Sequence, residues 1–286
     1  MGKISPAPRP LTSRHFPKVI RLPRSTTPVH TPAVSSAPPL PENTSLAFIG
    51  EAEWSPAVIT ASQAKSLAAT RNPAGRPNSD VLRSFAGKTG RLLRERWQID
   101  FPAHYREQEA ALHEMPFARL QKQIGRASGF WWINPHAQPP LRHALARLDR
   151  FLATPLDSPE PSWSWFESEH LPDASLLVVA RDDDFTHAVL RSAAFTAWWR
   201  ACFRKQTPTQ VIESFPFPWP PATPLGSLTK DQQDFRSSVA RAAISGDADQ
   251  INSAVAAAYG WPSSGEEGEI LTALHELHSQ RCSRGR

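Results

Sequence analysis

Three strings in this sequence have residue types and spacings that could support chemistry. HELH (275–278) holds two histidines three residues apart, whereas the helix of a zinc protease spaces them four apart, so we expect a solvated helix face. RDDDF (181–185) offers three carboxylates that could bind a cation, but acidic residues in a hairpin turn need no metal. AGKTG (86–90) is not a phosphate-binding loop, because Leu82 stands where such a loop has its first glycine.

A fourth string lies close to a catalytic motif. NPHAQPP (134–140) superficially resembles the Asn-Pro-Pro-aromatic motif with which amino methyltransferases hold the target amine and stack on a flipped base. His136 and Ala137 stand where that motif has a proline and the aromatic ring, so we do not interpret the string as catalytic. Only Cys202 and Cys282 are present, which argues against a disulfide framework and a cysteine zinc site. The sequence therefore predicts no catalytic centre and no metal site.

Basic side chains offer a different chemistry, the binding of polyanions. The chain of 286 residues has a formal net charge of +5, but the charges are segregated. Residues 71–150 hold 14 Lys and Arg against 7 acidic residues, and residues 151–286 hold 11 against 17. A basic segment beside an acidic one fits a local polyanion-binding surface. The alternative is that surface helices simply carry these charges.

The elements that must position these residues predict an α+β fold. Residues 1–41 contain ten of the 29 prolines and few large apolar residues, so we expect them to be disordered. A mixed α/β domain should follow over 42–206, then an extended connector over 207–226 and a helical C-terminal region over 227–286. In the connector, Phe215, Phe217 and Trp219 each precede a proline, which biases them to extended backbone and predicts a stiff link that pins the helical region.

Periodicity and breaker residues predict the individual elements. Helices are expected over 60–71 with Thr60 as N-cap, over 104–124 with a kink or restart at Pro116, and over 139–151, 193–205, 229–245, 247–259 and 266–281. Strands are expected over 97–101 and 129–133, and a two-stranded hairpin over 175–192. Residues 72–80 should form a loop that is dense in Asn, Pro and Gly.

Several strings in a fixed order carry a family resemblance. They are NPAGRPNSDVLR (72–83), WQIDF (97–101) followed by EQEAALHEMPF (107–117), LDRFLATP (148–155), LLVVARDDDF (176–185) and PTQVIESFPFP (208–218). Together they resemble the distal half of large bacterial DNA methyltransferases of the fused restriction–modification kind, the MmeI-like group, and their adenine-specific relatives. The resemblance runs from about residue 42 to the C-terminus.

In that family the distal half is a target-recognition domain with a helical tail. The resemblance therefore implies sequence-specific binding of double-stranded DNA, as part of a site-specific adenine methyltransferase in a restriction–modification system. DNA recognition needs Lys and Arg on phosphates, and Arg, Asn or Gln on base edges. The residues expected to make these contacts are Arg71, Arg76, Asn78, Ser79, Arg83, Lys88, Arg91, Arg126 and Arg142. For Asn78, a turn in which the side chain bonds nearby backbone stays an equal alternative.

In the same family, S-adenosylmethionine and the Asn-Pro-Pro-aromatic motif belong to an upstream Rossmann-like domain that has no counterpart in this sequence. We therefore expect this chain to bind no cofactor itself, to be inactive alone, and to have a methyltransferase catalytic subunit as a candidate partner. No apolar run approaches the ~18 residues of a membrane span, so a cytoplasmic location is predicted.

Two other interpretations stay open at this point. The acidic, helical C-terminal region could dock on a catalytic subunit, with any DNA contact incidental. Alternatively, the chain could be a non-functional remnant of a truncated methyltransferase gene, with residues 1–41 read from a shifted frame.

Overall fold

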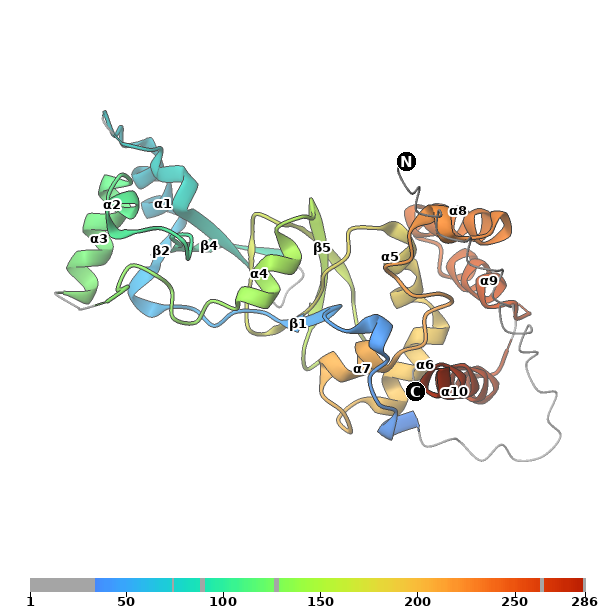
Figure 1. Cartoon of the computed structure of the whole chain (residues 1–286). Helices are drawn as coiled ribbons and strands as arrows, with labels where there is room; N and C mark the ends of the chain where they lie inside the picture. The colour runs from blue at the N-terminus through green and yellow to red at the C-terminus, as the bar shows by residue number, and fades with distance from the viewer. Residues whose placement is uncertain (1–33, 74, 88–90, 126–128, 263–264, 285–286) are drawn as a thin grey trace, which may run out of the picture.

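The computed structural model of this chain describes residues 34–73, 75–87, 91–125, 129–262 and 265–284 (Figure 1). Its architecture is mixed α/β, as the sequence predicts. One sheet has the strand order β1 (Ala47–Ile49), β8 (Leu176–Val179), β5 (Arg150–Pro155), β6 (Ser164–Glu167), with all pairs antiparallel. A second has the order β2 (Val58–Thr60), β4 (Arg91–Ile99), β3 (Leu82–Gly87), β7 (Leu171–Pro172), in which β3 and β7 pair in parallel.

The second sheet carries a distal lobe, which we define as residues 54–133. Its helices are α1 (Ala61–Ala69), α2 (Glu107–Ala110) and α3 (Glu114–Ile124), and they lie at one end of the elongated molecule (Figure 1). Thr60 begins α1 with a capping box, as predicted. Helix α3 restarts with Pro116 in its first turn, where a missing N–H leaves no hydrogen bond unmade. The lobe has its own hydrophobic core, built from residues that include Ile59, Leu67, Ile99, Phe101, Leu120 and Trp132.

Helices dominate the other end of the molecule, while α4 (Pro139–Leu145) lies in the middle beside the sheets (Figure 1). The helical end comprises α5 (Asp184–Arg191), α6 (Ala193–Cys202), α7 (Pro208–Ser214), α8 (Lys230–Ser245), α9 (Ala248–Tyr259) and α10 (Glu267–Arg284). Trp198 and Trp199 of α6 are fully buried, so the aromatic pattern of this helix forms core as expected. The three helices predicted after the connector are confirmed. Among the described residues, no helix is both long and apolar enough to cross a membrane.

Two predicted β segments are wrong. Residues 129–133 form turns rather than a strand, because Gly129 has a positive φ of 78° and the Ile133 N–H donates to the Phe130 carbonyl at 3.0 Å. The expected hairpin over 175–192 is instead strand β8 followed by helix α5. Asp183 accepts the Thr186 N–H at 2.9 Å as the N-cap of α5, so this carboxylate starts a helix rather than occupying a hairpin turn.

The packed chain begins earlier than the sequence indicates. Residues 1–33 of the expected disordered segment lie outside the described part, but residues 34–41, here called the N-terminal segment, pack on the helical end. Val34 and Leu40 are buried in it, and the Leu40 N–H donates to the Glu213 carbonyl at 2.8 Å. The high proline content of this segment predicts disorder, but its apolar side chains pack into the core of the folded chain.

The connector predicted over 207–226 is not extended throughout, because Thr207 caps helix α7 (Pro208–Ser214) and proline is accepted in its first turn. The residues that follow α7 do attach to the helical region, through both their rings and their carbonyls. Phe215, Phe217 and Trp219 are at most 4 % exposed, and the rings of the two phenylalanines lie 5.0 Å apart in an edge-on arrangement. Its carbonyls accept hydrogen bonds from the last two helices. Tyr259 donates to Pro216 at 2.9 Å, and Arg281 donates to Phe217 at 2.6 Å. Since prolines fix the backbone, these carbonyls are presented at little cost in entropy.

Replacing Phe217 with alanine tests the role of the connector. Because the ring is fully buried, Phe217→Ala is expected to lower the free energy of unfolding by about 3–5 kcal/mol. Phe130→Ala is the matched control, since that ring is 73 % exposed and its removal should change stability by less than about 0.5 kcal/mol. Urea unfolding followed by tryptophan fluorescence measures both. Equal losses for the two variants would contradict a structural role for the connector.

Candidate nucleic-acid interface

The loop over residues 71–80 is fixed by two asparagine side chains. Asn78 is 1 % exposed and its amide donates to the Leu67 carbonyl at 3.0 Å and to the Thr70 carbonyl at 3.2 Å. Asn72 donates to the Asn78 side chain at 2.7 Å. These bonds hold the loop against the C-terminal end of α1, which gives Asn78 a structural role in the free protein.

A second set of contacts ties the same loop to the segment between α2 and α3. The Arg76 N–H donates to the Leu112 carbonyl at 2.9 Å, and the His113 ring lies 2.8 Å from the Pro77 carbonyl through Nδ1. A Cβ atom at Gly75 would lie 2.1 Å from the Leu112 oxygen, so this position admits only glycine. The loop is therefore held from both sides before any ligand arrives.

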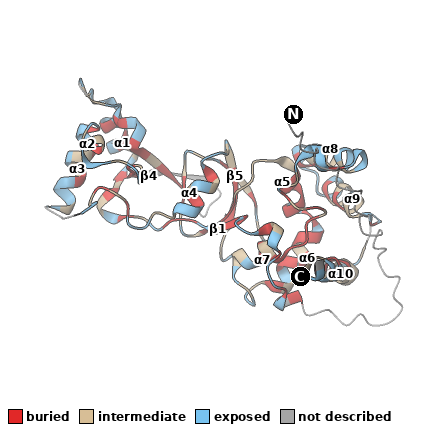
Figure 2. Cartoon of the chain, viewed as in Figure 1, coloured by how far each residue is buried: buried red, intermediate tan, exposed pale blue. Residues whose placement is uncertain are grey.

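The arginine side chains of the pinned loop are exposed to solvent. The neighbouring helices α1 and α3 also carry exposed residues, drawn pale blue in Figure 2. Arg71 and Arg76 are exposed, as is Ser79. Arg76 lies over the Tyr105 ring at 5.4 Å and donates to the Tyr105 hydroxyl at 2.9 Å, which orients its guanidinium. Within the described part of the chain, neither arginine forms a salt bridge, so their charges are available to an anionic ligand.

Arg83 lies further along the second sheet, where it lines a pocket of about 340 Å³. The pocket also contains His170, whose Nδ1 is 2.6 Å from the Ser84 hydroxyl. Burial lowers the pKa of His170 below its usual value, so this ring is neutral at physiological pH. Glu167, Glu169 and His170 offer ligand atoms within 4.8 Å of one another, but both glutamates are exposed, Glu167 at the end of β6 and Glu169 on the turn that follows.

Arg142 is committed to an ionic cluster and faces the same pocket. Its guanidinium donates to Glu51 at 2.7 and 2.8 Å and to Asp100 at 2.9 Å, and these two carboxylates are 1 % and 7 % exposed. Burial raises the pKa of Asp100, although attraction to Arg142 opposes the shift. Burial alone would lower the pKa of Arg142, but its bonds to both carboxylates raise it. This arginine therefore stabilises the fold, and the two carboxylates already neutralise its charge.

The other predicted contact residues give less information. Lys88 and Arg126 lie outside the described residues. The backbone of Arg91 begins β4, opposite Gly87 in the β3–β4 pairing, but its side chain is outside the described part. The structure thus brings Arg71, Arg76 and Ser79 together on one loop. It separates them from Arg83 and Arg142, which line the pocket.

An exposed aromatic side chain in the distal lobe was not predicted. Phe130 is 73 % exposed, and it lies beside Trp132, with ring centroids 5.5 Å apart. Trp132 itself is buried and donates from its indole nitrogen to the Tyr105 carbonyl at 3.1 Å, so the turn is firmly anchored. The apolar string GFWWI predicts a strand. The positive φ of Gly129 and the turn hydrogen bond from Ile133 to Phe130 replace that strand with a turn, on which Phe130 is exposed.

The fold has a counterpart among restriction–modification enzymes. It is similar to the type IIL restriction-modification enzyme MmeI, whose structure was determined in complex with DNA. The TM-score is 0.51 at 13 % sequence identity, and the match covers 87 % of this chain and 36 % of that one. The likeness thus concerns the fold, and the chain spans about a third of the length of that enzyme. No known family profile and no curated protein matches the sequence.

Removing the shared arginine tests the ionic cluster. Arg142→Ala leaves two buried carboxylates unpaired, so we expect the free energy of unfolding near neutral pH to fall by about 3–5 kcal/mol. The loss should be smaller at about pH 5 than at about pH 8. The raised pKa of Asp100 would rise further without its partner, and the folded chain would then bind a proton that the unfolded chain does not.

Urea unfolding at the two pH values measures this effect. Arg147→Ala is the control, because Arg147 is exposed just beyond α4 and forms no ion pair with the described residues. A loss for Arg142→Ala that does not depend on pH would contradict the assignment of buried, unpaired carboxylates.

Proposed function

We propose that this chain is the DNA target-recognition part of a site-specific methyltransferase in a restriction–modification system. The observation that carries the proposal is the loop over residues 71–80, which is held rigidly and presents Arg71 and Arg76 without acidic partners in the described structure. The likeness in fold to a restriction–modification enzyme that was solved with DNA supports it, and so does the excess of basic residues over residues 71–150.

In this proposal the residues that the sequence predicts at the DNA surface have different roles. Arg71 and Arg76 contact phosphates or guanine edges, and Ser79 is a hydrogen-bonding neighbour. Asn78 and Arg142 hold the protein surface in shape and do not touch DNA. Arg83 stands half-buried at the pocket, and we assign it a contact with DNA only if the duplex reaches that far along the second sheet.

The chemistry of methyl transfer would come from elsewhere. We propose that S-adenosylmethionine and the adenine-binding motif belong to a catalytic domain supplied by another chain or another part of the protein. In this structure the string NPHAQPP forms a turn that leads into α4 at Pro139, and the Asn134 Oδ1 atom accepts the His136 N–H at 2.8 Å, so this oxygen is occupied locally. Methyl transfer to DNA by the purified chain alone would contradict this part of the proposal.

Neutralising the two loop arginines tests the DNA-binding surface. Arg71→Ala combined with Arg76→Ala should weaken duplex binding and reduce the slope of log K against log salt by nearly 2, since each phosphate contact contributes about 0.9. Fluorescence anisotropy over a salt series measures this slope. The charge-matched control combines Lys230→Ala with Arg241→Ala, both exposed on α8, and should bind as the wild type does.

A selection from a random duplex library tests sequence specificity. Recovery of one enriched site is expected from a recognition domain. If the folded chain binds every duplex and heparin equally well, it is not a sequence-specific recognition domain. That result would favour the interpretation of the chain as a remnant of a truncated methyltransferase gene.

A docking role for the helical end is a second candidate. Leu225 and Ile244 are 60 % and 76 % exposed, in a region rich in acidic residues. If a methyltransferase encoded beside this gene co-elutes with the chain in gel filtration, Ile244→Asp should abolish the co-elution while Arg71→Ala leaves it unchanged. The reverse pattern would place the contact in the distal lobe.

A further inference from the structure

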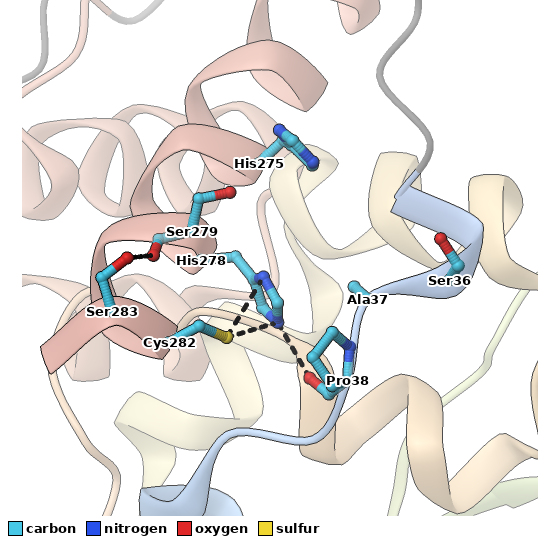
Figure 3. Close-up of a pocket in the computed structure, with 8 residues that line it drawn as sticks. All are labelled: Ser36, Ala37, Pro38, His275, His278, Ser279, Cys282 and Ser283. Carbon is cyan, nitrogen blue, oxygen red and sulfur yellow. Dashed lines mark hydrogen bonds between the residues drawn. The ribbon is translucent and has the colours of Figure 1, made fainter. Parts of the chain in front are cut away.

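The last helix, α10, faces a cavity that the DNA-binding proposal does not use. Its volume is about 520 Å³, and it lies between α10 and the N-terminal segment. The helix contributes His275, His278 and Cys282 to the lining, and the N-terminal segment contributes Pro38 (Figure 3). The spacings of three and four residues place the three side chains on one face of the helix.

His278 is not on the solvated face that the sequence predicts. It is 3 % exposed, and its Nε2 lies 2.9 Å from the Pro38 carbonyl, an arrangement in which Nε2 carries the proton and donates it (Figure 3). The other ring nitrogen, Nδ1, is then unprotonated and free to bind a cation. A metal-binding histidine is oriented in this way by an outer hydrogen bond to a backbone carbonyl.

Cys282 lies one helical turn beyond His278. Its Sγ is 3.8 Å from Nδ1 and 3.7 Å from Nε2 of the imidazole. In a tetrahedral zinc site a nitrogen and a sulfur ligand stand roughly 3.5 Å apart, which is close to this separation. Because Sγ is almost equidistant from the two nitrogens, it lies over the ring rather than on the Nδ1 axis, and Cys282 must change rotamer to meet an ion bound to Nδ1.

We propose that His278 Nδ1 and Cys282 Sγ bind a thiophilic divalent cation of the zinc class, with His275 as third ligand and water as fourth. His275 lies on the preceding turn of the same helix face and is partly exposed at the cavity (Figure 3). Its ring nitrogens are not grouped with the ligand atoms of His278 and Cys282 in this structure, so it must change rotamer to coordinate the ion. On binding, the Cys282 thiol releases its proton to solvent and coordinates as thiolate.

A further observation supports the site. The His278 ring bonds to Pro38, so an ion on Nδ1 would strengthen the attachment of the N-terminal segment to α10. Cys202 offers no alternative, because it is fully buried in the core and burial raises the pKa of its thiol to about 12.

Cadmium titration of the tag-free, reduced full chain tests the proposal. We expect thiolate-to-cadmium absorption in the ultraviolet that saturates at one ion per chain, and a higher melting temperature with zinc. Cys282→Ser should remove the absorption, and His275→Ala should weaken binding at least about tenfold, the smallest loss that even an outer-shell change causes. Ser279→Ala, which lines the same cavity, and Cys202→Ala should bind as the wild type does.

Absence of the absorption at stoichiometric cadmium would overturn the site. So would an absorption that survives in Cys282→Ser or disappears in Cys202→Ala. Circular dichroism of each variant shows that it is folded before the titration. None of these measurements involves DNA, so their outcome is independent of the proposed recognition function.

Discussion

One guanidinium shared by two buried carboxylates connects the distal lobe to the rest of the molecule. Arg142 comes from α4, Glu51 from the segment between β1 and β2, and Asp100 from the end of β4. Three separate pieces of chain therefore meet at one charge cluster. Each ion is costly to bury alone, so the arrangement is stable only when all three are in place. This condition sets the position of the sheet on which the distal lobe is built.

The loop over residues 71–80 is likewise held by hydrogen bonds within the protein before any ligand binds. The side-chain amides of Asn72 and of the buried Asn78 hold its backbone, and Gly75 allows the close approach to Leu112 that completes it. A loop ordered in the free protein loses little entropy when a ligand binds. The two asparagines therefore support the structure of the loop. The neighbouring Arg71 and Arg76 remain exposed and free of acidic partners in the described structure.

At the helical end, separate segments are held together by hydrogen bonds to backbone carbonyls. Prolines in the connector leave its carbonyls without strand partners, and Tyr259 and Arg281 from the last two helices take them up. The N-terminal segment is held in a similar way by Gln206 and His278. Segments from both ends of the chain are thus joined mainly through backbone carbonyls, with Arg281 as a charged donor that also pairs with Glu42 at 3.4 Å. The distal lobe, by contrast, is joined through a cluster of buried ions.

The sequence by itself determined what depends on near neighbours. The mixed α/β class, the capped start of α1, the restart of α3 at Pro116 and the helices after the connector all follow from periodicity, capping and proline chemistry within a few residues. Only the tertiary structure decided which charged side chains are available to bind a ligand. Arg142 and Glu51 are 91 residues apart in sequence, so no local pattern shows that this arginine is neutralised while Arg76 is not. Burial and ion pairing are properties of the folded chain, because they depend on which distant groups share a region without water.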